Sequence, residues 1–241
     1  MIEDIRMIVT DMDGTFLNSK HEKSPEFSHI YQQLKEKNII FIPASGRSLP
    51  SITNYFEDIE NEIGFIADNG CHIIFKNEEL YIDQLDYELM VRIIEQSRKI
   101  NDAHIVLSGK KTAYFETNDE KAIDYISQFY SQYQKVDNLI EVASETIFKI
   151  AIYHPNGSEA NLYPFMKNFE EFGLKVVVSG EFWLDILNQN TNKGNAVKKL
   201  QNLLNISPEQ TMAFGDYMND LEMLSNAKYS FAMENAHPII K

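Results

Sequence analysis

Two acidic residues follow directly after the first apolar run of the chain. Residues 7–9 predict a short buried strand, and Asp11 and Asp13 come just behind it, before a glycine that can turn the chain sharply. In open α/β sheets, ligands bind in the crevice beyond the carboxyl ends of the strands. We therefore expect both carboxylates at the mouth of such a crevice.

A second acidic cluster lies near the other end of the chain. Residues 211–215 again predict an apolar strand, which is followed by Asp216, and Asn219 and Asp220 come next at the start of a helical pattern. Four carboxylates at two strand ends would repel one another unless a cation lies among them. Oxygen ligands favour Mg²⁺. The alternative is that each motif is a turn with solvated acids.

Two further polar motifs follow predicted strands. Residues 39–42 predict a strand that ends before Ser45, Gly46 and Arg47. The Ser45 hydroxyl and the Gly46 amide could donate to phosphoryl oxygens, or they could mark the start of a helix. Arg47 could reach a substrate phosphate or carboxylate, or an acidic neighbour. Asn69 follows the next strand and is either a turn residue before glycine or a site residue.

Lys193 opens a strongly periodic helix in the last quarter of the chain. A lysine at a helix N-terminus is unfavourable with respect to the helix dipole. Residues that contradict a local structural preference are expected at functional sites, so Lys193 is a candidate site residue. The commoner explanation for such a lysine is that it is simply exposed.

These stretches resemble, in order, the four motifs of the haloacid dehalogenase-like phosphatases. They are similar above all to the Cof-like subfamily, whose cap domain is inserted between the second and third motifs. The resemblance implies an α/β fold, with a Rossmann-like parallel-sheet core and an inserted α+β cap domain. The motifs are Asp11-Met12-Asp13-Gly14-Thr15, Ala44-Ser45-Gly46-Arg47, Asn192-Lys193-Gly194 and Gly215-Asp216-Tyr217-Met218-Asn219-Asp220.

The predicted domains are a discontinuous core, residues 1–82 and 184–241, and a cap, residues 83–183. Within the cap, the predicted element order α-β-β-α-β-α-β-β indicates a sheet with helices on one face. Tyr125, Tyr130 and Tyr133 are expected to be half-buried core residues at helical spacing. Related chains usually continue past residues 235–238 with a further strand and helix, whereas this sequence ends at Lys241.

The resemblance also implies a role for each motif residue. Asp11 would be the nucleophile, Asp13 the general acid and base, and Lys193 the group that neutralises Asp11 and the phosphoryl charge. Mg²⁺ would be held by the Asp11 carboxylate, the Asp13 main-chain carbonyl and Asp216, with Asp220 holding a metal-bound water. The substrate or its phosphate would be bound by Ser45, Gly46, Arg47, Asn69 and Asn219.

The function implied by the resemblance is a Mg²⁺-dependent phosphatase that acts on a small phosphorylated metabolite through an aspartyl-phosphate. A phosphotransferase or mutase on the same scaffold is the nearest alternative, and a non-catalytic phosphometabolite-binding regulatory protein is another. Dehalogenation is disfavoured because that branch does not keep an acid two residues after the nucleophile, where Asp13 stands.

The composition limits the classes of molecule that the protein is expected to bind. A formal charge of −14 disfavours nucleic acid and anionic membrane surfaces, both of which need clustered Lys and Arg. The N-terminus lacks the basic and apolar regions of a signal peptide, so we expect a cytoplasmic protein, either a monomer or a homodimer. The single cysteine, Cys71, cannot form an internal disulfide and is expected in the core.

Overall fold

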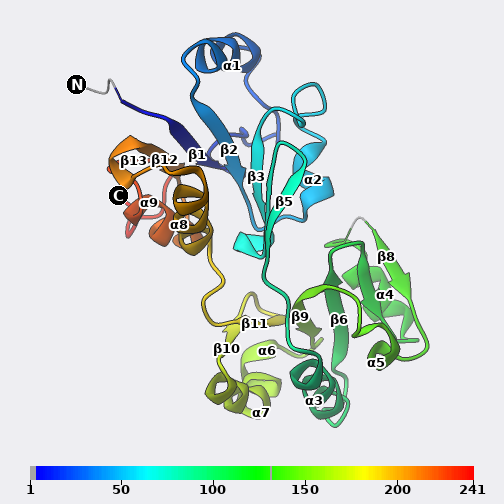
Figure 1. Cartoon of the computed structure of the whole chain (residues 1–241). Helices are drawn as coiled ribbons and strands as arrows, with labels where there is room; N and C mark the ends of the chain where they lie inside the picture. Colours follow the sequence, from blue (N-terminus) through cyan, green and yellow to red (C-terminus); the bar gives the residue numbers. More distant parts are fainter. Residues whose placement is uncertain (1–3, 131) are drawn as a thin grey trace. The chain divides into compact units, whose positions relative to one another are not determined.

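The computed structural model describes residues 4–130 and 132–241 and divides the chain into two compact units (Figure 1). Unit 1 comprises Met1–Ile82 and Thr191–Lys241, and unit 2 comprises Asp83–Asn190. Each unit has its own sheet and its own hydrophobic core.

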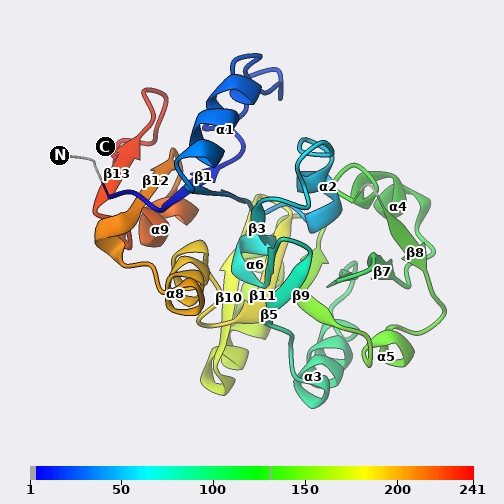
Figure 2. The same cartoon turned by 45° about the horizontal axis from the view of Figure 1, so that its top comes forward.

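Unit 1 is built on a seven-stranded sheet in the order β13-β12-β1-β2-β3-β4-β5. Figures 1 and 2 both show β1 beside β12, which comes from the far end of the sequence. The last two strands form an antiparallel hairpin, β4 (His72–Phe75) and β5 (Glu78–Ile82). The other five are parallel, so their carboxyl ends share one edge: β1 (Met7–Asp11), β2 (Ile40–Ala44), β3 (Gly64–Ala67), β12 (Thr211–Gly215) and β13 (Tyr229–Ala232).

Helices cover both faces of this sheet. Successive residues of a strand point to opposite sides, so the apolar strands present apolar side chains on both faces. Phe41 packs in one cluster with residues of α1 (Phe27–Glu36) and α2 (Leu49–Thr53). Ile42 packs in another with residues of α8 (Lys193–Leu204) and α9 (Leu221–Ser225). This three-layer arrangement is the predicted Rossmann-like α/β core. Short turns of helix complete it: η1 (Asp68–Gly70), η3 (Pro208–Gln210) and η4 (Met218–Asp220).

Unit 2 contains a six-stranded sheet in the order β10-β11-β9-β6-β7-β8. Its strand pairs are antiparallel except for β7 with β8, so the unit is the predicted α+β structure. The strands are β6 (His104–Gly109), β7 (Ala113–Phe115), β8 (Tyr133–Lys135), β9 (Ile147–Tyr153), β10 (Leu174–Val178) and β11 (Trp183–Asn188).

The helices of unit 2 lie on both faces of its sheet, so the expectation of one covered face is wrong. Leu107 shares a cluster with residues of α3 (Tyr87–Ser97), α5 (Leu139–Val142) and α7 (Tyr163–Met166). The neighbouring residue Val106 points the other way and packs with α4 (Glu120–Ile126). Because α4 ends at Ile126, Tyr133 lies on β8 instead of a helix, and it is exposed.

The helical segment over residues 158–172 is interrupted. It forms three short pieces, α6 (Ser158–Asn161), α7 and η2 (Lys167–Phe172). Pro164 lies in the first turn of α7, where its missing N–H is tolerated, whereas inside a longer helix it would remove a hydrogen bond.

The chain returns to unit 1 later than predicted. Residues 184–190 were expected in the core, but β11 pairs with both β9 and β10 and therefore belongs to unit 2, and unit 1 resumes at Thr191. In the part of the chain that the structure describes, no helix is both long enough and apolar enough to cross a membrane.

Candidate active site

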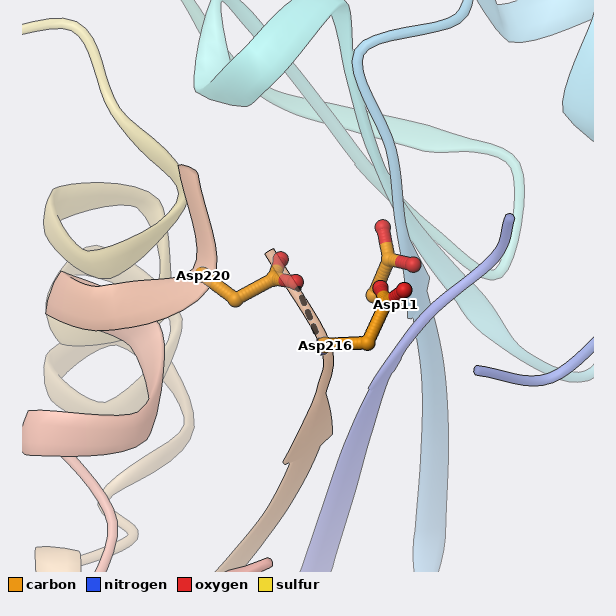
Figure 3. Close-up of side chains that lie close together, drawn as sticks. All are labelled: Asp11, Asp216 and Asp220. Carbon is orange, nitrogen blue, oxygen red and sulfur yellow. Dashed lines mark hydrogen bonds between the residues drawn. The ribbon is translucent and has the colours of Figure 1, made fainter. Parts of the chain in front are cut away.

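Three carboxylates meet at the carboxyl edge of the unit 1 sheet (Figure 3). Asp11 is the last residue of β1, Asp216 follows β12, and Asp220 is the last residue of η4. One oxygen of each lies within 4.8 Å of an oxygen of the other two. Because β1 and β12 are parallel neighbours, their ends bring together acids from opposite ends of the sequence.

The Lys193 side chain is buried between two of these carboxylates. Its Nζ donates to Asp11 Oδ1 at 2.5 Å and to Asp220 Oδ1 at 2.7 Å. Lys193 is the first residue of α8, and the Asn192 side chain caps this helix by accepting from the N–H of Asn195 at 2.7 Å. The two carboxylates offset the unfavourable interaction of the ammonium with the helix N-terminus.

Two glycines allow the chain segments to approach this closely. A Cβ on Gly194 would overlap the Cβ and the main chain of Glu222 in α9, so glycine lets the start of α8 meet α9. Gly14 has a φ of +83°, and a Cβ there would overlap the Asp216 carboxylate. The turn after Asp13 therefore needs glycine for its backbone and for the space it leaves.

The Asp216 carboxylate is held by two side chains that were not predicted to belong to the site. Thr15 Oγ1 donates to Asp216 Oδ1 at 3.1 Å. Asn235 Nδ2 lies 3.2 Å from Asp216 Oδ2 and also donates to the Gly14 carbonyl at 2.9 Å. Thr15 lies within the first motif, so its hydroxyl group could have been recognised from the sequence as a hydrogen-bond donor at the site. Asn235 follows β13, and nothing in its local sequence indicates this contact.

Asp220 is fixed from the opposite side. Its Oδ2 accepts the main-chain N–H groups of Asp216 at 3.0 Å and Tyr217 at 3.1 Å, the first of which is the dashed line in Figure 3. One Asp220 oxygen thus accepts from the loop after β12, and the other accepts from the Lys193 ammonium.

The electrostatics show an excess of negative charge. Burial raises the pKa of Asp11 to about 6, against the attraction of the Lys193 ammonium and with a further contribution from the Asp220 charge. Burial also raises the pKa of Asp216, and the Asp220 charge adds to that shift. Lys193 alone therefore does not compensate the charged forms of these carboxylates.

A divalent cation fits this donor set. Three carboxylates and one ammonium leave a formal charge of minus two, and every ligand atom offered by the acids is an oxygen. Mg²⁺ prefers such oxygen donors. A cation among the three acids would also lower the raised pKa values of Asp11 and Asp216.

Asp13 does not join these acids, so the expectation of four converging carboxylates is wrong for its side chain. Among the described residues, the acidic group consists of the other three. Arg47 binds the Asp13 carboxylate through two nitrogens, and His21 Nδ1 lies 3.1 Å from Asp13 Oδ1. Coordination by the Asp13 main-chain carbonyl stays a prediction.

The remaining predicted site residues gather at the ends of β2 and β3. Ser45 is buried and follows Ala44, the register partner of Asp11. Asn69 has a left-handed φ of 54°, and its N–H donates to the Ser45 carbonyl at 2.9 Å. Its side chain accepts from Asn219 Nδ2 at 3.2 Å, and a Cβ on Gly46 would lie 3.0 Å from Asn69 Nδ2. The two asparagines and the loop after β2 are therefore neighbours.

A Rossmann-like core with an inserted α+β unit and an acid-rich site at the end of its first strand defines the class of haloacid dehalogenase-like proteins. The model of the haloacid dehalogenase-like hydrolase family matches residues 8–241, so this chain belongs to that family.

Individual relatives extend over nearly the whole chain. The 5-amino-6-(5-phospho-D-ribitylamino)uracil phosphatase YbjI of Escherichia coli is 31% identical over 237 residues, which cover 96% of this chain and 86% of the relative. A Streptococcus mutans structure matches with a TM-score of 0.83 at 32% identity, covering 98% of this chain and 90% of that one. A Thermotoga maritima structure matches with a TM-score of 0.88 at 28% identity, covering 98% and 89%.

Replacement of Lys193 tests the charge balance of the site. In excess chelator, Lys193→Met should lower the free energy of unfolding by about 3–5 kcal/mol, because it leaves buried carboxylates without their cation. Added Mg²⁺ should stabilise this variant more than the wild type, since the acidic group has lost a positive charge. Urea unfolding followed by circular dichroism, with and without Mg²⁺, measures both effects.

Lys198 provides the matched control. It lies exposed on the same helix, so Lys198→Met should change the free energy of unfolding by no more than about 0.5 kcal/mol. Equal stabilities of the two variants in chelator would contradict the role given to the Lys193 ammonium. A Mg²⁺ response that is the same in Lys193→Met and wild type would contradict the charge argument.

Proposed function

We propose that this protein is a Mg²⁺-dependent phosphatase that hydrolyses a small phosphorylated metabolite, a sugar phosphate or a cofactor phosphate, through an aspartyl-phosphate intermediate. The observation that carries the proposal is the group of buried Asp11, Lys193 and Asp220 with half-buried Asp216, together with a further acid two residues after Asp11. Membership in a hydrolase family whose relatives include named phosphatases supports it.

In the first step, a carboxylate oxygen of Asp11 attacks the phosphorus atom. The bond between phosphorus and the ester oxygen breaks, and that oxygen takes a proton from the Asp13 carboxyl group as the alcohol leaves. Lys193 Nζ, bound to Asp11 Oδ1, fixes the nucleophile and offsets the charge that gathers around the phosphoryl group.

In the second step, a water molecule attacks the phosphorus atom of the aspartyl-phosphate. Asp13 accepts a proton from this water, and the bond to Asp11 breaks to release inorganic phosphate and restore the carboxylate. Division of one hard displacement into two easier ones is the advantage of the covalent route.

The other residues would bind the metal and the phosphoryl group. Mg²⁺ would be held by the Asp11 carboxylate, the Asp13 main-chain carbonyl and Asp216, with Asp220 bound to one of its waters, and it would supply charge neutralisation. Asn219 would contact the phosphoryl group or orient Asp216. The Ser45 hydroxyl and the Gly46 amide would donate to phosphoryl oxygens, and Asn69 would add a polar contact.

Unit 2, in this proposal, is the cap domain that limits which esters are hydrolysed. The E. coli relative is named for the hydrolysis of 5-amino-6-(5-phospho-D-ribitylamino)uracil, a small phosphorylated molecule. That compound therefore belongs in a screen of phosphorylated metabolites, which is the direct route to the substrate of this protein.

Metal dependence is the first test. Hydrolysis of an aryl phosphate, measured as inorganic phosphate released without an alcohol acceptor, should require Mg²⁺ and stop in excess chelator. Ca²⁺ should inhibit in competition with Mg²⁺, because it accepts more and longer oxygen contacts and would misplace the nucleophile. Full activity in excess chelator would refute the metal requirement, and phosphoryl transfer only to an added alcohol would favour a phosphotransferase.

Substrate size is the second test. A cap that excludes water and bulky groups should allow turnover of sugar phosphates or small cofactor phosphates and should prevent turnover of a folded phosphoprotein. Phosphate release from both classes, compared at equal concentration of phosphoryl groups, measures this selectivity. Comparable rates on the two classes would show that unit 2 does not restrict access.

The third test separates the two neighbouring aspartates. Asp11→Asn should abolish both turnover and covalent labelling, because no acyl phosphate can form. Asp13→Asn should give a burst of nitrophenol near one equivalent and then a steady state slower by about 10²- to 10⁴-fold, since nitrophenolate leaves without an acid but water still needs a base. Rapid mixing with nitrophenyl phosphate, followed by detection of phosphate trapped on Asp11, measures both variants.

The Asp11→Asn variant also controls for labelling at other sites. If Asp13→Asn binds Mg²⁺ but shows neither burst nor trapped phosphate, Asp13 does not have the role proposed for it.

A further inference from the structure

The guanidinium group of Arg47 binds the Asp13 carboxylate side-on. Arg47 Nε donates to Asp13 Oδ2 at 2.8 Å, and Nη2 donates to Oδ1 at 2.5 Å. Such a paired contact fixes the plane of the carboxylate as well as its position, because both groups are planar.

Arg47 is itself held at both ends. Nη1 of its side chain donates to the Tyr55 hydroxyl at 3.2 Å, and the guanidinium lies 5.7 Å from the centre of the Tyr55 ring. Its main-chain N–H donates to Ser45 Oγ at 3.1 Å, and its carbonyl accepts from the N–H of Asp68 at 2.9 Å. The loop after β2 thus sets the position from which the guanidinium binds Asp13.

The same contacts involve the loop that follows Asp13. His21 Nδ1 lies 3.1 Å from Asp13 Oδ1 and 3.3 Å from Arg47 Nη2, and Lys23 Nζ donates to the Tyr55 carbonyl at 2.8 Å. Asp13 is partly exposed, with 41% of its side chain accessible, so packing alone does not fix it. The contacts of Arg47 supply that restraint.

We propose that Arg47 is a positioning residue for Asp13 and acts on the proton-transfer steps, instead of binding the transferred phosphoryl group. The inference rests on the proposed function, in which Asp13 protonates the leaving oxygen and then activates water. A general acid or base must reach its proton within hydrogen-bond distance, so a displaced Asp13 would slow both steps while Asp11 continues to bind and attack phosphorus.

Kinetics of Arg47 variants test this inference. With nitrophenyl phosphate, Arg47→Met should show a nitrophenol burst followed by a slower steady state, as expected for Asp13→Asn. With an alkyl phosphate, kcat should fall about 10²-fold, the cost of a displacement near 1 Å, while KM changes little. Arg47→Lys should recover only part of kcat, because an ammonium cannot make the paired contact.

The double variant gives the sharpest discrimination. If Arg47 acts only through Asp13, adding Arg47→Met to Asp13→Asn should cause no further loss of kcat. Inhibition by inorganic phosphate should also be the same in wild type and Arg47→Met. Multiplicative losses in the double variant, or weaker inhibition by phosphate, would overturn the inference and place Arg47 on the phosphoryl group.

Arg98→Met is the matched control. Arg98 binds Glu116 in unit 2 by the same paired geometry, at 2.7 Å and 2.6 Å, so its loss removes a comparable ion pair away from Asp13. This variant should show the same time course of nitrophenol release as the wild type. Absence of any phosphatase activity in the wild type would refute the proposed function itself, a result that the variants cannot produce.

Discussion

The geometry of unit 1 depends on the Lys193 ammonium enclosed between the carboxylates of Asp11 and Asp220. The Lys193 side chain has no exposed surface, and a charge that has lost its hydration is tolerated only where opposite charges and hydrogen bonds replace the water. The three residues come from β1, α8 and η4, so the contact requires element ends from both segments of unit 1 to meet. After unit 2, the chain must therefore return to unit 1 with the first residue of α8 placed at the end of β1.

The contacts of Lys193 with Asp11 and Asp220 restrict which residues can occupy the neighbouring positions. The start of α8 approaches α9 because Gly194 has no side chain, and the turn after Asp13 clears Asp216 because Gly14 has none. The Asp216 carboxylate is oriented by Thr15 and Asn235, which come from the two ends of the sequence. The site is thus held mainly by contacts between segments that are distant in the chain.

That dependence on distant contacts decides what could be predicted from the sequence. The α/β core and its strand ends follow from local patterns, and Lys193 drew attention because it breaks the rule for helix starts. The contacts of Asn235, the placement of α4 on the second face of its sheet and the membership of β11 in unit 2 depend on tertiary packing. No local period encodes such contacts, and for this reason the sheet of unit 2 was wrongly predicted to have helices on one face only.

The position of the Asp13 side chain also could not be predicted from local sequence patterns. Its separation from the other three acids determines the formal charge of the site. Two residues apart on a continuing strand, Asp11 and Asp13 would point to the same face, but β1 ends at Asp11, so the alternation of strand side chains does not extend to Asp13. Asp13 is thereby directed to Arg47, which balances its charge with a separate cation. The three carboxylates that remain share Lys193 and carry a formal excess of minus two. A fourth carboxylate there would leave a formal charge of minus three, so separation of the two aspartates keeps the excess at a value that one divalent cation would balance.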